Sequence, residues 1–226
     1  MLVGAAFIYF SSLPNITEQL GEGDTVDTDL SRNKTSVFQF PHVWLGALAI
    51  FFYVGLEVLA GDVISLYGKN LGFADDRIKF FTSFGLTGLL VGYVASIFLI
   101  PKYIKQERWL MFSALLGILM CFVTYFSSKE MAIMSIVALN FANAVMWPAI
   151  FPLGIRDIGR FTNIGSALLV MGIIGGAVVP PLYGWIYEKS GWGIDFRLAY
   201  LLIMIVSYSY ILWFGRSGHK IGFPKS

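Results

Sequence analysis

Charged side chains are scarce in this sequence, and their scarcity argues against an ordinary soluble domain. Only 13% of the residues are charged, whereas about a quarter would be typical of a soluble domain. Hydrophobic residues make up 57% of the chain, and the mean hydropathy is +0.71. Several apolar runs reach the ~20 residues that cross ~30 Å of hydrocarbon. We therefore predict an integral membrane protein that is embedded in a lipid bilayer.

Cysteine and histidine are also rare, which removes two kinds of site. Cys121 is the only cysteine, so no internal disulfide can form, and the two histidines are too far apart to give a metal-ligand spacing. The sequence shows no glycine-rich phosphate loop, no Ser/His/Asp pattern and no basic patch with interleaved aromatic residues. We therefore expect no metal, no cofactor, no nucleic-acid partner and no enzymatic activity.

The long apolar runs predict six membrane-spanning helices. Runs of this length without alternation do not suit a transmembrane β-barrel. The predicted fold class is therefore all-α, a polytopic six-helix bundle over residues 42–216. The predicted spans are Val43–Tyr67, Phe80–Ile100, Trp109–Phe126, Met131–Ile155, Ile164–Tyr187 and Leu198–Gly215.

The first 41 residues are expected to lie outside this bundle. Residues 1–12 include the apolar stretch "MLVGAAFIYF", which is too short to span and lacks the basic start and cleavage site of a signal peptide. We interpret them as the end of a membrane helix whose beginning is missing. Residues 13–41 are polar, have no helical period and are predicted to form a flexible loop.

The distribution of Lys and Arg predicts the orientation of the bundle. The side that holds the 13–41 loop and the tail, residues 217–226, carries ten Lys and Arg, and the opposite side carries six. Cytoplasmic loops are enriched in these residues. The loop and the carboxyl terminus are therefore expected in the cytoplasm, with the bundle in a bacterial inner membrane.

Two acidic residues fall within the first predicted span. Glu57 lies fourteen residues after Val43 and is therefore deep in the membrane. A carboxylate at that depth costs about 2.5–3.5 kcal/mol on insertion scales, so it usually faces a cavity or a partner. Asp62 is closer to the outer end and could equally lie among the lipid headgroups. Both are candidates for ion coupling, and Glu57 is also a candidate for substrate binding.

The fourth span, in "LNFANAVMWPAIFPLG", carries polar and aromatic residues that a lipid anchor does not need. Asn140, Asn143 and Trp147 have the spacing of one helical face. The amides could bind ligand hydroxyls, or they could join neighbouring helices. Trp147 offers a flat surface for a sugar ring. With Glu57 at a similar depth, and with Tyr53 on the same span as Glu57, these residues are the candidate substrate-binding set.

Three glycines of the fifth span predict a close helix contact. Gly172, Gly175 and Gly176 have the spacing that lets two helices touch backbone to backbone. Tight packing is the main interpretation. A helix that slides or hinges during a conformational cycle is also compatible with this pattern.

Three segments of the sequence resemble a known family. "ALAIFFYVGLEVLAGDVISLY", "NAVMWPAIFPLGI" and "GSALLVMGIIGGAVVPPLYGWIYE" resemble the fucose/glucose/galactose–proton symporters of the major facilitator superfamily. The resemblance implies the carboxyl-terminal half of a twelve-helix fold, a hexose as substrate, a proton as the coupling cation, and alternating access. The superfamily's basic loop motif is degenerate here, with Tyr93 after Gly92. The acids usually tied to proton coupling belong to the absent amino-terminal half.

Three functional hypotheses follow from the sequence. The first is a carboxyl-terminal half or fragment of a sugar:proton symporter, whose main partner is the missing amino-terminal six-helix half. The second is a complete six-helix protein that forms a homodimer and acts as a transporter or channel for another small solute. The third is a membrane enzyme or receptor subunit, which the lack of a catalytic constellation disfavours.

Overall fold

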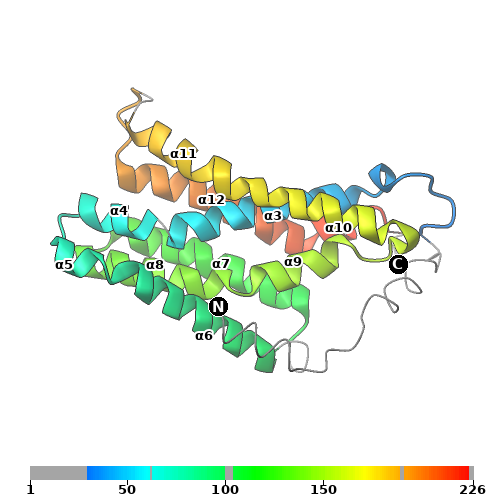
Figure 1. Cartoon of the computed structure of the whole chain (residues 1–226), viewed down its shortest axis with the longest axis horizontal. Helices are drawn as coiled ribbons and strands as arrows, with labels where there is room; N and C mark the ends of the chain where they lie inside the picture. The colour runs from blue at the N-terminus through cyan, green and yellow to red at the C-terminus, as the bar shows by residue number, and fades with distance from the viewer. Residues whose placement is uncertain (1–29, 62, 100–103, 189–190, 224–226) are drawn as a thin grey trace, which may run out of the picture.

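The computed structural model describes residues 30–61, 63–99, 104–188 and 191–223. Within these ranges the regular structure is entirely helical. Six helical segments are long and apolar enough to cross a membrane, which confirms the predicted all-α, six-span fold. The segments lie side by side along the long axis of the molecule (Figure 1). The predicted helix end at residues 1–12 and most of the predicted loop at 13–41 lie outside the described residues.

The observed helices follow the predicted spans closely, except where a span is divided. The short helical turns are η1 (Val37–Gln39), α5 (Asp75–Ile78), η2 (Gly159–Phe161), η3 (Gly172–Ile174) and η4 (Gly218–Lys220). The helices of the spans, in chain order, are α3 (Pro41–Gly61), α4 (Val63–Asn70), α6 (Phe81–Leu99), α7 (Gln106–Phe126), α8 (Lys129–Asn143), α9 (Met146–Gly154), α10 (Thr162–Met171), α11 (Gly175–Glu188) and α12 (Phe196–Arg216).

The fourth span is interrupted near its middle, where α8 gives way to α9. The helix stops at Asn143 and resumes at Met146. Pro148 explains the position of the break, because proline has no N–H to donate and its ring clashes with the carbonyl four residues earlier, at Ala144. The cause of the break is therefore local to the sequence. The break leaves two helices, α8 and α9, that can differ in direction.

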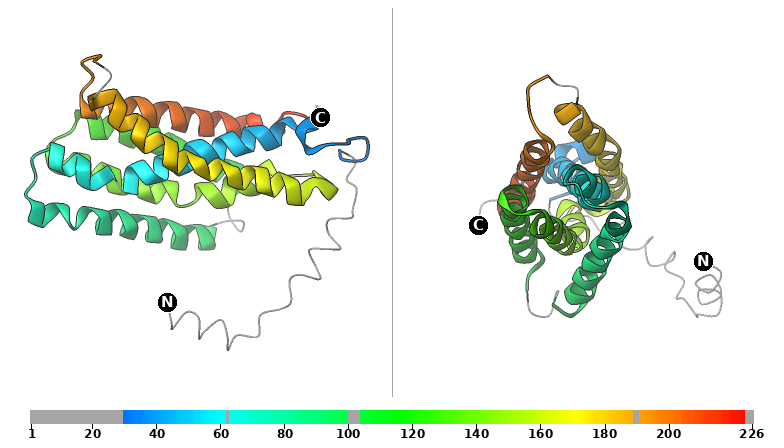
Figure 2. Two further views of the ribbon diagram at one scale, coloured as in Figure 1. Left: turned by 45° about the horizontal axis from the view of Figure 1, so that its top comes forward. Right: turned by 90° about the vertical axis from the view of Figure 1, so that its left-hand side faces the viewer.

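Helix α3 lies at the centre of the packing. It contacts α8, α9, α10, α11 and α12, while α6 packs mainly on α8, and α7 packs along α12. The end-on view in Figure 2 shows α3, in blue, surrounded by the other helices. A helix in this position presents each of its faces to a different neighbour, so side chains of α3 can meet groups from most other spans.

Helix α12 is joined to α7, the third span, by side-chain hydrogen bonds as well as by packing. The Arg197 guanidinium, at the start of α12, donates through Nη1 to the carbonyl oxygens of Tyr125 at 3.3 Å and Ser127 at 3.2 Å. These carbonyls stand at the end of α7, where no later turn of the helix can supply a donor. Arg197 therefore caps α7 from a neighbouring helix.

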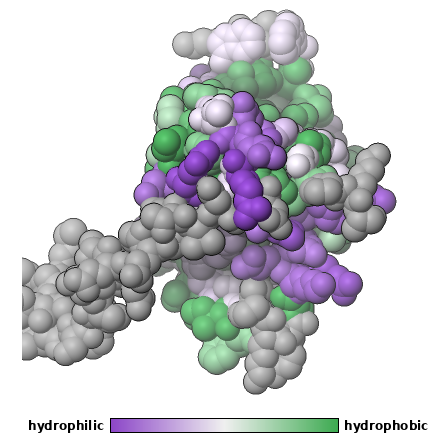
Figure 3. Space-filling model, turned by 90° about the vertical axis from the view of Figure 1, so that its right-hand side faces the viewer, coloured by the Kyte–Doolittle hydropathy of each residue, from purple (hydrophilic) through white to green (hydrophobic). Residues whose placement is uncertain are grey.

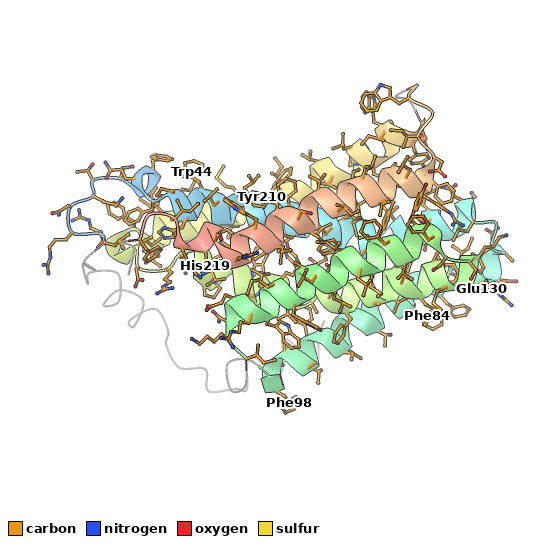
Figure 4. All side chains as sticks on the ribbon, turned by 180° about the vertical axis from the view of Figure 1, so that it is seen from behind. Trp44, Phe84, Phe98, Glu130, Tyr210 and His219 are labelled. Atoms are coloured by element: carbon orange, nitrogen blue, oxygen red, sulfur yellow. The ribbon has the colours of Figure 1, made fainter. Side chains whose placement is uncertain are left out.

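Apolar side chains cover the outer surface along the helices. Phe84 and Phe98 project outward from α6 (Figure 4), and Phe112 and Phe126 of α7 are exposed by 52% and 76%. An apolar surface of this extent is rare on a soluble monomer and suits lipid. Hydrophilic residues gather instead at the end where α3 begins, as the end-on space-filling view shows (Figure 3).

Candidate functional site

Glu57 is the one charged side chain that the described residues place deep within a span. It lies on α3 and is partly exposed, whereas Tyr53, one turn earlier on the same face, is only 1% exposed. The Tyr53 hydroxyl contacts the Glu57 carboxyl and the hydroxyl of Tyr93 on α6. The acid therefore lies beside the Tyr53 hydroxyl, which can donate to it, and the Tyr53 hydroxyl in turn lies beside that of Tyr93.

Tyr93 is a site residue that the sequence reasoning missed. It is partly exposed and packs with Trp109 and with Ala144 and Val145, the two residues of the break between α8 and α9. Its hydroxyl at membrane depth is a signal in the sequence. The sequence alone does not reveal that α6 approaches α3 at this level, because that proximity results from the packing of α6 on α8.

Trp147 packs on Tyr53, one turn from the acid along α3, and supplies a flat aromatic surface. Its ring centroid is 6.2 Å from that of Tyr53 and 5.9 Å from that of Phe151, with which it stacks at 21°. Trp147 and Phe151 are both partly exposed. We refer to Tyr53, Glu57, Tyr93 and Trp147 as the acid–aromatic cluster. It draws on α3, α6 and α9 and lies where the fourth span is interrupted.

Asn140 joins two helices in this conformation. It is 2% exposed, and its Nδ2 donates to the carbonyl oxygens of Ala60 at 3.1 Å and Ile136 at 3.0 Å. Both amide hydrogens are therefore used by backbone groups. The contact with Ala60 places Asn140 within one turn of Glu57 along α3, at the similar depth that the sequence indicated.

Asn143 is the last residue of α8 and is fully buried. Its Oδ1 accepts a hydrogen bond of 2.6 Å from the Tyr208 hydroxyl on α12, while its Nδ2 has no partner among the described residues. Asn140 thus points to α3 and Asn143 to α12, while Trp147 packs on Tyr53. The three side chains do not present one common face to a single ligand in this conformation.

The glycines of the fifth span face α3. A Cβ at Gly172 would lie 2.5 Å from the Ala47 carbonyl oxygen, one at Gly175 would overlap the Phe51 carbonyl oxygen, and one at Gly176 would lie 3.1 Å from two valine methyl groups of α3. A second glycine series, which the sequence reasoning did not single out, lies on α6. Cβ atoms at Gly88 and Gly92 would come within 2.7 Å of backbone carbonyl oxygens of α8.

The acid–aromatic cluster has the chemistry of a site for a polyhydroxylated ligand. Hydroxyl and carboxylate groups can form hydrogen bonds with ligand hydroxyls, and the indole face can pack on the C–H face of a ring. Asp62, the second predicted coupling candidate, lies outside the described residues. Among the described residues, no group of three or more His, Cys, Asp or Glu is placed to hold a metal ion.

Comparison with known proteins gives relatives over most of this chain. It is 31% identical over 196 residues to the glucose/galactose transporter of Brucella abortus (strain 2308), covering 84% of this chain and 45% of the relative. It is 28% identical over 221 residues to the putative glucose/galactose transporter of Helicobacter pylori (strain J99), covering 97% of this chain and 52% of the relative. It is 25% identical over 201 residues to the L-fucose-proton symporter of Escherichia coli (strain K12), covering 84% of this chain and 44% of the relative.

A solved structure shares the fold. The crystal structure of the major facilitator superfamily transporter FucP in the outward conformation matches with a TM-score of 0.74 and 22% identity, over 96% of this chain and 51% of that one. No family model matches the chain. The chain spans about half the length of the curated relatives that it matches.

Proposed function

We propose that this chain, which belongs to the fucose/glucose/galactose–proton symporter family of the major facilitator superfamily, forms the carboxyl-terminal half of a secondary active sugar transporter. The named relatives transport glucose and galactose or couple L-fucose to protons, and the chain matches about half of each. The six-helix bundle is the size of one of the two units that rock about a shared site in alternating access. The half-length match favours this hypothesis over a six-helix homodimer.

The observation that carries the proposal is the acid–aromatic cluster. Its one deep acid is accompanied by two tyrosine hydroxyls and a partly exposed indole, on spans whose other surfaces are apolar. A charged group at this depth is costly unless it has a partner or a task. In the proposed role, a hexose lies against Trp147, and its hydroxyls form hydrogen bonds with Glu57 and Tyr93, which are partly exposed. The buried Tyr53 supports the Glu57 carboxyl from the protein side.

Asn140 and Asn143 have a second role in this proposal. In the described conformation both are buried and engaged with other helices, so neither can reach a ligand without a helix movement. The free Nδ2 of Asn143 lies at the break between α8 and α9, where the fourth span can bend. We propose that direct sugar contact by Asn143 requires a change at this break, and that Asn140 holds α8 on α3.

Replacing Trp147 tests the sugar site. Trp147→Ala in the full-length transporter should weaken sugar binding by about 2 kcal/mol, or roughly 30-fold, because the apolar platform for the ring is lost. Trp147→Phe should be milder, because a ring remains. Equilibrium binding of radiolabelled glucose, galactose and fucose to membranes measures the effect. The matched control is Trp213→Ala on the outer face of α12, where the indole is 41% exposed. Unchanged affinity in Trp147→Ala would remove the indole from the site.

The charges at the two ends support a cytoplasmic carboxyl terminus. Among the described residues, the end where α3 begins and α12 ends has eight Lys or Arg and two acids, Glu107 and Asp157. The opposite end has five Lys or Arg and five acids. The basic residues of the first end are Arg32, Lys34, Lys105, Arg108, Arg156, Arg160, Arg216 and Lys220. An excess of Lys and Arg marks the cytoplasmic side. We therefore propose that this end faces the cytoplasm, in the inner membrane of a bacterium.

Paired cysteine substitutions test this orientation. Ser217→Cys, just after α12, and Ser128→Cys, just before α8, place exposed thiols at opposite ends. An impermeant maleimide added to intact cells should label Ser128→Cys and should reach Ser217→Cys only after the cells are opened. The native Cys121 is buried and should contribute little labelling. The reverse labelling pattern would invert the proposed topology.

A further inference from the structure

Three tyrosines from three spans meet at the end of the bundle opposite the carboxyl terminus. Tyr67 of α4 is 0% exposed, and Tyr183 of α11 and Tyr200 of α12 are each 1% exposed. The ring of Tyr200 packs edge-on against the other two, with centroids 5.2 Å from Tyr67 and 6.0 Å from Tyr183. We refer to these residues as the tyrosine trio. They lie apart from the acid–aromatic cluster and share no residue with it.

The hydroxyls of the tyrosine trio are buried without a hydrogen-bond partner among the described residues. A buried hydroxyl left unpaired costs about 1–3 kcal/mol, and phenylalanine would fill the same space without that cost. The three hydroxyls belong to rings that pack against one another, so they lie in one region of the bundle. One unpaired group could be an isolated imperfection, but three at one place indicate a shared partner.

Another buried tyrosine shows how this fold pairs a phenol when a side chain is available. Tyr208, two turns after Tyr200 on α12, is 0% exposed and donates to Asn143 Oδ1 at 2.6 Å. Among the described residues, no side chain is hydrogen-bonded to a hydroxyl of the tyrosine trio. The charges of Arg197 and Asp195 act on Tyr67, but both side chains form their hydrogen bonds with backbone groups.

We infer that the tyrosine trio holds ordered water, buried between α4, α11 and α12, that forms the hydrogen bonds these hydroxyls lack. A phenol can donate one hydrogen bond and accept others, and a buried water commonly forms two to four. Water bound in this way joins three spans that share no direct hydroxyl–hydroxyl bond. It stabilises this end of the bundle, whichever solute the protein carries.

Radiolytic hydroxyl-radical labelling with mass spectrometry tests the inference in the full-length protein in proteoliposomes. Radicals generated from a bound water oxidise the side chains around it even when bulk solvent cannot reach them. Tyr67, Tyr183 and Tyr200 should be oxidised several-fold faster than Tyr208, which is equally buried but paired with a side chain. Equal rates at all four tyrosines, or no oxidation of the trio, would overturn the inference.

A substitution gives a second readout. Tyr200→Phe keeps the ring and removes one hydroxyl, so the water loses a partner and oxidation of Tyr67 and Tyr183 should fall several-fold. Tyr210→Phe is the matched control, because it removes a hydroxyl of the same helix that instead donates to the Leu45 carbonyl at 3.1 Å. Unchanged oxidation of Tyr67 and Tyr183 in Tyr200→Phe would contradict a shared water. If Tyr200→Phe does not fold, the comparison within the native protein decides alone.

Discussion

Glu57→Gln is expected to abolish uphill sugar accumulation by the full-length transporter. Glutamine has the same size as glutamate and still forms hydrogen bonds, but it cannot take up and release a proton. If Glu57 belongs to the coupling machinery, the variant should bind sugar and exchange it down a gradient while losing concentrative uptake altogether. Uptake and counterflow in proteoliposomes with an imposed pH gradient separate these activities.

The same experiment distinguishes coupling from binding. If Glu57 instead only contacts the sugar, counterflow and binding should fall with uptake, by about 1–3 kcal/mol or roughly 5- to 150-fold for one lost hydrogen bond. Glu130→Gln is the control, because Glu130 is an exposed acid in the first turn of α8, away from the acid–aromatic cluster (Figure 4). Normal concentrative uptake in Glu57→Gln would remove Glu57 from both roles.

Gly175→Ala is expected to destabilise the protein strongly and to reduce transport with it. The new methyl group would overlap the carbonyl oxygen of Phe51 and lie 2.7 Å from its carbonyl carbon. Backbone atoms cannot rotate away, so α11 must separate from α3. Overpacking of this kind costs about 1–3 kcal/mol or more. Thermal unfolding of the detergent-solubilised protein measures the loss, and uptake should fall because α3 also carries Tyr53 and Glu57.

Gly184→Ala provides a control on the same helix. Nothing lies within 4 Å of a Cβ at Gly184, so the methyl group meets open space and replaces a poor helix former with a good one. Its unfolding temperature should be unchanged or higher. If Gly175→Ala unfolds at the same temperature as Gly184→Ala and transports normally, the contact between α11 and α3 is looser than described.

The spans could be predicted from the sequence because their signal is local. An apolar run of membrane length has few alternatives to a helix, since backbone groups in lipid must be paired within the segment. The break in the fourth span also has a local cause in Pro148. The glycines of α6 were harder to interpret, because Gly88 and Gly92 gain meaning only once α8 is known to lie against them.

The candidate site was less accessible to sequence reasoning, because it depends on which spans meet. The depth of Glu57 and the aromatic surface of Trp147 could be inferred from position and residue type. That Tyr93 joins them, and that Asn140 is occupied by the Ala60 carbonyl, depends on the contacts of α3 with α6 and α8. Buried amides in a membrane span suit a ligand and a neighbouring helix equally well, and only packing distinguishes the two.

The contacts of Arg197 and Tyr208 also set an order for biogenesis. Both residues belong to α12, which leaves the ribosome after the other described spans. They complete hydrogen bonds for the end of α7 and for Asn143, which are synthesised earlier. Until α12 inserts, the nascent bundle holds a buried amide without this partner in a medium that offers no water. A translation product that ends before α12 therefore leaves the Asn143 amide in the bilayer without the hydroxyl that pairs with it in the complete bundle.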